Sequence, residues 1–211
     1  MLEKELRITK LETQRRNRDR ISIYINDKFV LGVHRSIIYK FNIEEGNIVD
    51  RGYIEKVIGA QEQKRAKDYA VKLLSYRQRS QREIEDKMEQ KGYDGNVINK
   101  TLKWLKEYGL INDEDFAKEF VISKSKNYGS KRIRMELSRK GVEEGIIDDI
   151  LNREVDCERE YDIALECAKK KIKAYRGEKR DAVYRKLGSY LQRRGFSYDI
   201  ICKVLREVMD F

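Results

Sequence analysis

From about residue 64 onward, apolar positions recur in three units of about fifty residues each. The units are marked by Gly92, Gly141 and Gly195, and each glycine follows a lysine or an arginine. In every unit, apolar residues stand four and eight positions before the glycine and six and ten positions after it. The apolar residues are Ile84, Met88, Ile98 and Leu102 in the first unit, Ile133, Leu137, Ile147 and Leu151 in the second, and Leu187, Leu191, Ile201 and Leu205 in the third. Such self-similarity predicts a helical repeat protein.

The spacing predicts three helices in each unit. Residues four apart are neighbours on a helix surface, so the apolar pair before each glycine indicates an amphipathic helix. Glycine readily takes the left-handed conformation that ends a helix, and a cation beside it suits the negative helix end. The later apolar pair indicates a second helix, and an opening helix lies around Ala70, Ala117 and Ala164. Units this small rarely form a sufficient core alone, so we expect neighbours to pack against one another.

The N-terminal part has a different pattern. Residues 21–25 and 29–33 are rich in β-branched and aromatic residues and flank an Asn-Asp pair, which predicts an antiparallel meander of two or three strands within residues 1–33. A short helix should cover one face of this sheet with Ile37, Ile38, Phe41 and Ile43. We expect a second helix over 50–58 and a joint at Gly59.

The expected fold class is mainly α, with three tandem three-helix repeats that form an elongated curved array after a small β-containing N-terminal segment. The predicted parts are residues 1–60 for that segment and 61–112, 113–156 and 157–211 for the repeats. The chain contains no proline, so nothing in it interrupts helices as proline does.

Composition and cysteine content narrow the protein class. No apolar run reaches the roughly 18 residues of a membrane span, and the first residues do not begin a signal peptide. The three cysteines, Cys157, Cys167 and Cys202, form no CxxC motif. We therefore expect reduced, buried thiols in a cytoplasmic protein, with no contact to a membrane.

The candidate catalytic groups do not form a site. His34 is the only histidine, and a capping or surface role is expected for it. The acidic run 113–115 precedes an apolar stretch, where carboxylates favour a helix N-terminus. Asp148 and Asp149 are expected on a solvated helix face. No nucleotide-binding motif is present. We expect no enzymatic activity, no cofactor and no metal.

Charge indicates a binding face. Lys and Arg number 47 against 37 Asp and Glu, which gives a net charge of +10. The first and third repeats are basic and the middle one is slightly acidic, so a simple sleeve around duplex DNA is less favoured. Basic residues gather near both ends of the middle helices, and arginine suits bidentate contact with carboxylate or phosphate. The candidate partner-binding or DNA-binding residues are Arg77, Arg79, Arg82, Lys131, Arg132, Arg134, Arg193 and Arg194.

Two ordinary alternatives remain open for this face. The basic residues could form a solvated surface with intrahelical ion pairs, such as Arg82 with Glu85 or Asp86. The tyrosines near the clusters, Tyr76, Tyr128 and Tyr175, are expected in the core, and base stacking is the less favoured role.

Four segments together resemble the RecX family of regulatory proteins. They are residues 70–80 (AVKLLSYRQRS), 91–93 (KGY), 110–117 (LINDEDFA) and 193–197 (RRGFS). The resemblance covers roughly 64 to 209, and the leading β-like segment is similar to an extension in the longer members. The sequence departs from the family at Gln78, where proline is common, but Ser80 can still cap the following helix.

The resemblance implies a non-enzymatic cytoplasmic regulator that binds RecA, mainly as its filament on single-stranded DNA. Such a protein would modulate ATPase activity, strand exchange and filament persistence, within recombination, DNA repair and the SOS response. It is expected to be a monomer with weak direct DNA contact at most. The alternative is a helical-repeat protein that binds DNA independently of RecA; a small hydrolase or nuclease is disfavoured.

Overall fold

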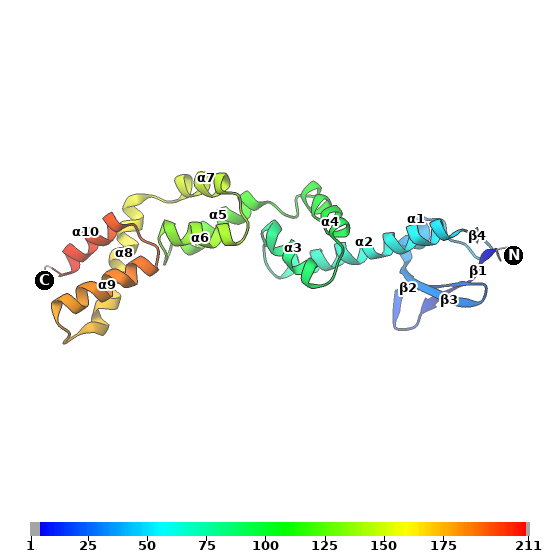
Figure 1. Ribbon diagram of the computed structural model, residues 1–211, viewed down its shortest axis with the longest axis horizontal. Coiled ribbons are helices and arrows are strands. Elements are labelled where there is room, and N and C mark those ends of the chain that lie inside the picture. The colour runs from blue at the N-terminus through cyan, green and yellow to red at the C-terminus, as the bar shows by residue number, and fades with distance from the viewer. Residues whose placement is uncertain (1–4, 210–211) are drawn as a thin grey trace. The chain divides into compact units, whose positions relative to one another are not determined.

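The computed structural model describes residues 5–209, which contain a four-stranded sheet and ten α-helices (Figure 1). The chain forms two compact units. The first comprises the residues up to 76 together with 88–104, and the second comprises 77–87 together with the residues from 105 onward. The sheet therefore belongs to the first unit, and the second and third repeats belong to the second unit.

The expected meander is present, and a short fourth strand is added to it. The strands are β1 (Leu6–Gln14), β2 (Asn17–Ile25), β3 (Lys28–His34) and β4 (Ile48–Val49), arranged in the order β3-β2-β1-β4 with antiparallel pairing throughout. Asn26 and Asp27 have φ values of 47° and 62°, which is the geometry of a tight two-residue hairpin turn. The turn between β1 and β2 takes only residues 15–16, so β2 begins earlier than its apolar pattern indicates.

Helix α1 (Arg35–Lys40) packs its apolar side chains onto the sheet, as the sequence predicts. Ile37 and Ile38 are buried in one cluster with Ile23 and Val33 of the strands. His34 is the N-cap residue of α1, and its Nδ1 accepts a hydrogen bond from the backbone N–H of Ser36 at 3.1 Å. The expected capping role of this histidine is confirmed.

Helix α2 (Arg51–Tyr76) is continuous through Gly59, so the predicted joint there is wrong. A glycine inside a helix costs only about 1 kcal/mol relative to alanine. Burial along the rest of the helix, including Val57, Ala66 and Ala70, offsets that cost. The second expected helix and the opening helix of the first repeat are therefore one element.

The mainly α class with three tandem three-helix repeats is confirmed. After α2, the first repeat continues with α3 (Gln81–Gln90) and α4 (Gly95–Glu107), and the second consists of α5 (Asp113–Lys124), α6 (Ser130–Arg139) and α7 (Glu144–Glu154). The third consists of α8 (Cys157–Ile172), a 3-10 turn at Lys173–Tyr175, α9 (Arg180–Arg193) and α10 (Tyr198–Met209). The residue boundaries of the four predicted parts remain predictions.

The glycines that mark the repeats end the middle helices. Gly92, Gly141 and Gly195 have φ values of +85°, +76° and +87°, the left-handed conformation that a helix end requires. Every apolar residue that defines the repeat pattern is buried. The apolar positions that repeat in the sequence are therefore the core positions of the three repeats.

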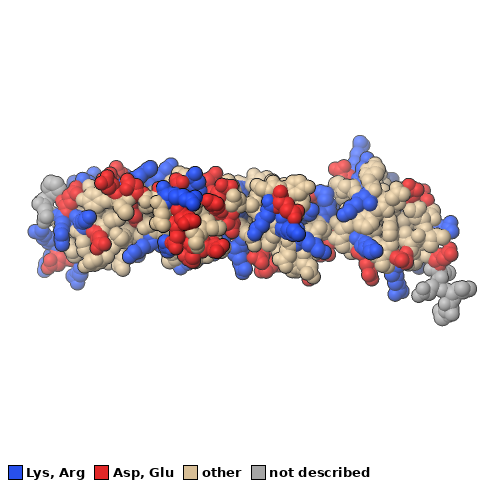
Figure 2. Space-filling view, turned by 90° about the horizontal axis from the view of Figure 1, so that it is seen from above, with Lys and Arg blue, Asp and Glu red and all other residues tan. Residues whose placement is uncertain are grey.

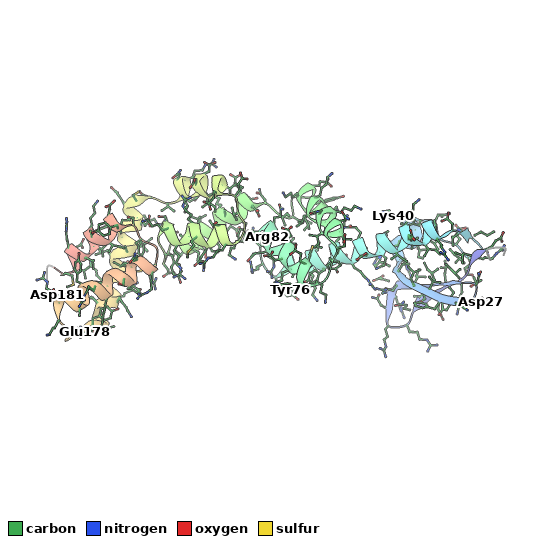
Figure 3. All side chains as sticks on the ribbon, viewed as in Figure 1. Asp27, Lys40, Tyr76, Arg82, Glu178 and Asp181 are labelled. Carbon is green, nitrogen blue, oxygen red and sulfur yellow. The ribbon has the colours of Figure 1, made fainter. Side chains whose placement is uncertain are left out.

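Two expectations about single side chains need correction. Tyr76 is 72% exposed, although a core position was expected, because it is the last residue of α2 and the chain leaves the helix there (Figure 3). Tyr128 and Tyr175 do pack against core clusters. The three described cysteines are free thiols, but none is fully buried as predicted: Cys157, at the start of α8, is exposed, and Cys167 and Cys202 are half-buried. Within residues 5–209, no helix has the length and apolar character needed to cross a bilayer.

The equivalent glycines differ in their surroundings, and this difference predicts unequal effects of substitution. A Cβ atom at Gly195 would lie 2.3 Å from the Cβ of Arg132, whereas a Cβ at Gly92 has nothing within 4 Å. We expect Gly92→Ala to cost about 1–2 kcal/mol from the backbone conformation alone. Gly195→Ala should cost about 1–3 kcal/mol more because the new methyl group overpacks the contact. Urea unfolding followed by circular dichroism measures both losses, and equal losses would contradict the close approach at Gly195.

Candidate functional site

The predicted basic residues gather where consecutive repeats meet. Between the second and third repeats, the start of α6 contacts the end of α9. The backbone N–H of Gly129 donates to the carbonyl of Arg194 at 2.9 Å, and the N–H of Lys131 donates to the carbonyl of Gly195 at 3.2 Å. A Cβ at Gly129 would lie 2.4 Å from the Gly195 oxygen. The two helix ends can therefore meet this closely only because both positions are glycines.

Two of the predicted arginines are held in place by this junction. The guanidinium groups of Arg132 and Arg194 lie 4.4 Å and 5.4 Å from the centroid of the Tyr128 ring. Arg132 also donates to the carbonyl of Arg193 at 3.1 Å and pairs with Glu136 at 2.9 Å. Arg194 donates to the carbonyl of Asn127 at 2.7 Å. These contacts give both arginines a structural role, and both guanidinium groups make cation–π contacts with the Tyr128 ring.

The junction between the first and second repeats is built in the same way. Ser80 donates from its hydroxyl to the carbonyl of Lys140 at 2.6 Å, and the same oxygen accepts from the N–H of Glu83 at 3.2 Å. The expected capping of α3 by Ser80 is therefore confirmed. A Cβ at Gly141 would lie 2.5 Å from the Cβ of Arg82, so a glycine again allows the approach.

A carboxylate from the following repeat completes each junction. Asp113 accepts from the backbone N–H of Gln81 at 2.8 Å, and Glu160 accepts from the N–H of Ser130 at 2.8 Å. Both carboxylates stand four residues before the buried alanine of their opening helix. The helix-terminal role predicted for the acidic run 113–115 is confirmed, and Asp113 additionally caps the neighbouring α3.

Glu83 is the most strongly perturbed carboxylate of this junction. Arg77 binds it through two nitrogen–oxygen contacts of 3.0 Å and 3.1 Å, and Lys140 contacts it at 2.6 Å. Burial by itself would raise the pKa of the Glu83 carboxyl. The hydrogen bonds from Arg77 and Lys140 outweigh burial and lower that pKa to about 2. The predicted site residue Arg77 is thus part of an internal ion-pair network.

Further predicted residues are engaged in local pairs. Arg82 pairs with Glu85 at 3.5 Å and Asp86 at 2.8 Å, as the solvated-surface alternative anticipates. Arg134 pairs with Glu144 at 3.3 Å and with Asp148, and its pKa is raised chiefly by the hydrogen bond to Asp148. Arg79 is half-buried and is also engaged in an interaction. On the face drawn in Figure 2, basic and acidic side chains are accordingly interspersed.

Lys131 and Arg193 differ from the other predicted residues. Both side chains are exposed, and within residues 5–209 the structure gives neither of them a hydrogen bond, an ion pair or a ring contact. Their backbones lie at the same junction, since Lys131 binds Gly195 and Arg132 binds Arg193. These two residues, together with Arg132 and Arg194 behind them, form what we call the basic junction.

A shallow hollow extends the basic junction along α9. It has a volume of about 410 Å³, and its lining includes Arg185, Lys186, Ser189 and Arg193. Lys186 pairs with Glu178 at 2.6 Å. Glu178 lies just before α9 begins (Figure 3). The Arg185 Nε donates to a backbone carbonyl of its own helix at 3.3 Å. Arg185 and Lys186 belong to the basic cluster at the start of the third middle helix, although they are not among the predicted site residues. The four-residue spacing of 185, 189 and 193 places Arg185 on one helix face with Arg193, and Lys186 lies three residues before Ser189.

The remaining acidic candidates do not converge. Asp148 and Asp149 have side chains that are 52% and 69% exposed, and they contact Arg134 and Arg153. Their predicted place on a solvated surface is confirmed. Across the part of the chain that the structure describes, no three His, Cys, Asp or Glu residues are grouped so as to hold a metal ion.

The lowered pKa of Glu83 predicts a pH-dependent contribution to stability. The folded pKa of about 2 lies below the ordinary value of 4.5, so the ion pairs stabilise the fold above pH 4.5 and lose their effect as the pH falls toward 2. At neutral pH we expect Glu83→Gln to cost about 1–3 kcal/mol. The difference from the unmodified protein should shrink in acid. Urea unfolding across this pH range measures it.

Asp149→Asn provides the matched control for that experiment, because its side chain is 69% exposed and its ion pair is long at 3.9 Å. We expect a change within about 0.5 kcal/mol for this exposed pair. A pH-independent loss for Glu83→Gln would show that the carboxylate charge does not stabilise the junction.

Models of one protein family match four stretches of the chain. The regulatory protein RecX N-terminal domain matches residues 6–50, and the first, second and third RecX three-helix domains match 66–105, 112–151 and 158–205. The matched stretches include the sheet of the first unit and both sides of each repeat junction.

Relatives and solved structures agree with these models. The chain is 31% identical over 206 residues to the regulatory protein RecX of Clostridioides difficile (strain 630), with 97% of this chain and 96% of the relative covered. It is 33% identical over 207 residues to that of Clostridium botulinum (strain Alaska E43 / Type E3), with 97% of both covered.

A crystal structure of regulatory protein RecX superposes with a TM-score of 0.76 at 26% identity and covers 97% of this chain and 98% of that one. The RecX structure from Lactobacillus salivarius has a TM-score of 0.63 at 27% identity, over 72% of this chain and 99% of that one. Sequence and structure thus match along nearly the whole length, and the chain belongs to the RecX family of regulatory proteins.

Proposed function

We propose that this protein is a non-enzymatic, cytoplasmic regulator that binds the RecA recombinase, mainly as its filament on single-stranded DNA. In this proposal a monomer changes ATPase activity, strand exchange and filament persistence. Family membership supports a regulatory role. The choice of surface depends on the basic junction, where the side chains of Lys131 and Arg193 are exposed and make no hydrogen bond or ion pair with other described residues.

The ion pairs and hydrogen bonds within the protein show which of the predicted basic residues are available to bind a partner. Arg77, Arg82, Arg132, Arg134 and Arg194 satisfy acidic or carbonyl groups of the protein itself, so breaking these contacts to bind a partner would have a cost. Exposed cations without such partners carry no equivalent cost. We therefore assign the direct contacts to Lys131 and Arg193, with the other predicted residues supporting them.

Any effect on ATP hydrolysis would follow from differential binding. A ligand shifts a conformational equilibrium only by as much as its affinity for the two states differs. We propose that the protein binds one state of the RecA filament better than another, and that the filament's own active sites then hydrolyse ATP at a changed rate.

A charge-reversal variant tests the basic junction. Lys131→Glu with Arg193→Glu should raise the concentration needed for a half-maximal effect on RecA ATPase by roughly tenfold, which corresponds to about 1.4 kcal/mol. The matched control is Lys203→Glu with Arg206→Glu, which changes the charge equally at exposed positions of α10. ATPase assays on single-stranded DNA and filament lengths by electron microscopy provide the measurements. If the unmodified protein alters neither, the proposed function is wrong.

The alternative function is DNA binding independent of RecA, and the hollow along α9, which Arg185 and Arg193 line, favours it as a second candidate. Binding through phosphate contacts releases counterions, so affinity falls steeply with salt. With RecA as the partner, we expect weak binding to a labelled oligonucleotide in fluorescence anisotropy. Tight binding that falls about tenfold or more between 50 and 200 mM salt would favour the alternative.

A further inference from the structure

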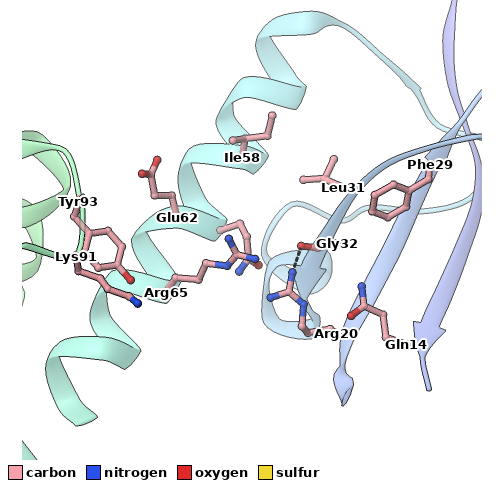
Figure 4. A pocket seen from close by; sticks show the side chains of 12 residues that line it. Gln14, Arg20, Phe29, Leu31, Gly32, Ile58, Glu62, Arg65, Lys91 and Tyr93 are labelled. Carbon is pink, nitrogen blue, oxygen red and sulfur yellow. Dashed lines mark hydrogen bonds between the residues drawn. The ribbon is translucent and has the colours of Figure 1, made fainter. Parts of the chain in front are cut away.

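The first unit contains a cleft that the basic junction does not involve. It has a volume of about 660 Å³ and lies between β3, α2 and the turn that joins α3 to α4 (Figure 4). Pockets of this size commonly bind ligands. All of its lining residues belong to the first unit, so the N-terminal sheet and the end of the first repeat's middle helix build it together.

One end of the cleft is apolar. Phe29 and Leu31 of β3 lie opposite Ile58 of α2 in Figure 4. Phe29 is 58% exposed and Ile58 is 47% exposed, although both belong to regular elements that bury other apolar residues. Neighbouring large apolar side chains that remain exposed often form an interaction surface, whereas a single exposed apolar side chain is common on any protein.

The other end of the cleft is cationic. Arg65 and Lys91 line it together with Tyr93, and both cations are exposed. Within residues 5–209, the structure gives neither cation a hydrogen bond or an ion pair. Glu62 is the single carboxylate in the lining. Two cations thus face one carboxylate at this end of the cleft, so positive charge predominates there.

An edge strand borders the cleft. β3 is the last strand of the sheet, and β2 is its one neighbour among the described strands. The backbone N–H of His34 points away from β2, because it donates to the side-chain oxygen of Gln61 on α2. Peptide groups alternate along a strand, so the N–H of Gly32 faces the same side. Gly32 itself lines the cleft. An added strand could accept a hydrogen bond from its N–H, whereas the Gly32 carbonyl accepts from Arg20.

We propose that this cleft binds an extended acidic segment of a protein partner, which lies alongside β3 with apolar side chains against Leu31 and Ile58 and carboxylates at Arg65 and Lys91. Addition of a strand to a sheet edge is a general mode of peptide recognition, in which backbone hydrogen bonds give affinity and pockets give specificity. We take the RecA filament to be the source of that segment, and only this choice of partner rests on the proposed function.

The lining favours a peptide over nucleic acid. The lining holds the aliphatic residues Leu31 and Ile58 and the aromatic rings of Phe29 and Tyr93. Bases bind best on aromatic faces, but Phe29 packs edge-on against Tyr24 and Tyr93 packs against Tyr69, each with ring centroids 5.9 Å apart. Glu62 repels phosphates and carboxylates alike, but a nucleic-acid strand carries a charge at every nucleotide, whereas a peptide can place an uncharged residue opposite Glu62. Arg20, the third cation of the lining, already donates to the Gly32 carbonyl at 2.6 Å, so it is not free to follow a phosphate chain.

The test uses the full chain and a short fluorescein-labelled peptide of alternating glutamate and valine. Arg65→Glu with Lys91→Glu should weaken peptide binding about tenfold, or about 1.4 kcal/mol. Lys72→Glu with Lys100→Glu is the matched control, because these exposed lysines belong to the same unit and do not line the cleft. Circular dichroism verifies that both variants are folded, and Ile58→Asp tests the apolar end separately.

Loss of peptide affinity in the cleft variants but not in the control supports the proposal. No binding by the unmodified protein, or equal affinities in all variants, overturns it. A selective loss of binding to labelled oligo(dT) in the cleft variants also overturns it, because the cleft would then be a nucleic-acid site. A parallel measurement with immobilised RecA filaments tests whether RecA is the partner. If the unmodified protein does not bind the filaments, the proposed function is refuted, but the peptide result still stands.

Discussion

The second unit depends on helix ends of opposite polarity that meet without a side chain between them. The N-terminus of α6 carries free N–H groups and positive partial charge, and the C-terminus of α9 carries free carbonyls and negative partial charge. Gly129 and Gly195 allow these ends to approach within hydrogen-bonding distance. The start of α3 and the end of α6 meet in the same manner around Gly141. Each repeat thereby satisfies polar groups that its neighbour alone would leave exposed.

This arrangement explains why a basic sequence gives so few available cations. The middle helices begin and end in Arg and Lys, and these residues meet again at the junctions, where Glu83, Glu136 and the Tyr128 ring engage them. Most of the basic residues that cluster in the sequence therefore contact groups of the protein itself, and only a few remain available to a partner. Lys131 and Arg193 are distinguished from their neighbours by orientation, which the repeat pattern alone does not reveal.

The sequence predicts the repeat cores well because burial and helix ends follow local rules. Gly92, Gly141 and Gly195 each end a helix, and a residue with a fixed backbone requirement is readable from spacing alone. Gly59 shows the limit of the same argument, since a glycine within a long helix is tolerated when the flanking turns are buried. The candidate site was only partly predictable. The ion pair of Glu83 with Lys140 and the cleft beside β3 join residues distant in sequence, and no local pattern specifies such contacts.

The capping carboxylates have a consequence for how the chain is made. Asp113 caps a helix of the repeat that precedes it, and Glu160 does the same one repeat later. A ribosome releases the helix first and its cap some thirty residues afterwards, while domains fold from the N-terminus as synthesis proceeds. The N-termini of α3 and α6 therefore lack these carboxylates until the next repeat has emerged. Docking of each repeat onto the preceding one thus completes the earlier helix, and a nascent chain that stops before Glu160 would leave the Ser130 N–H of α6 without its acceptor.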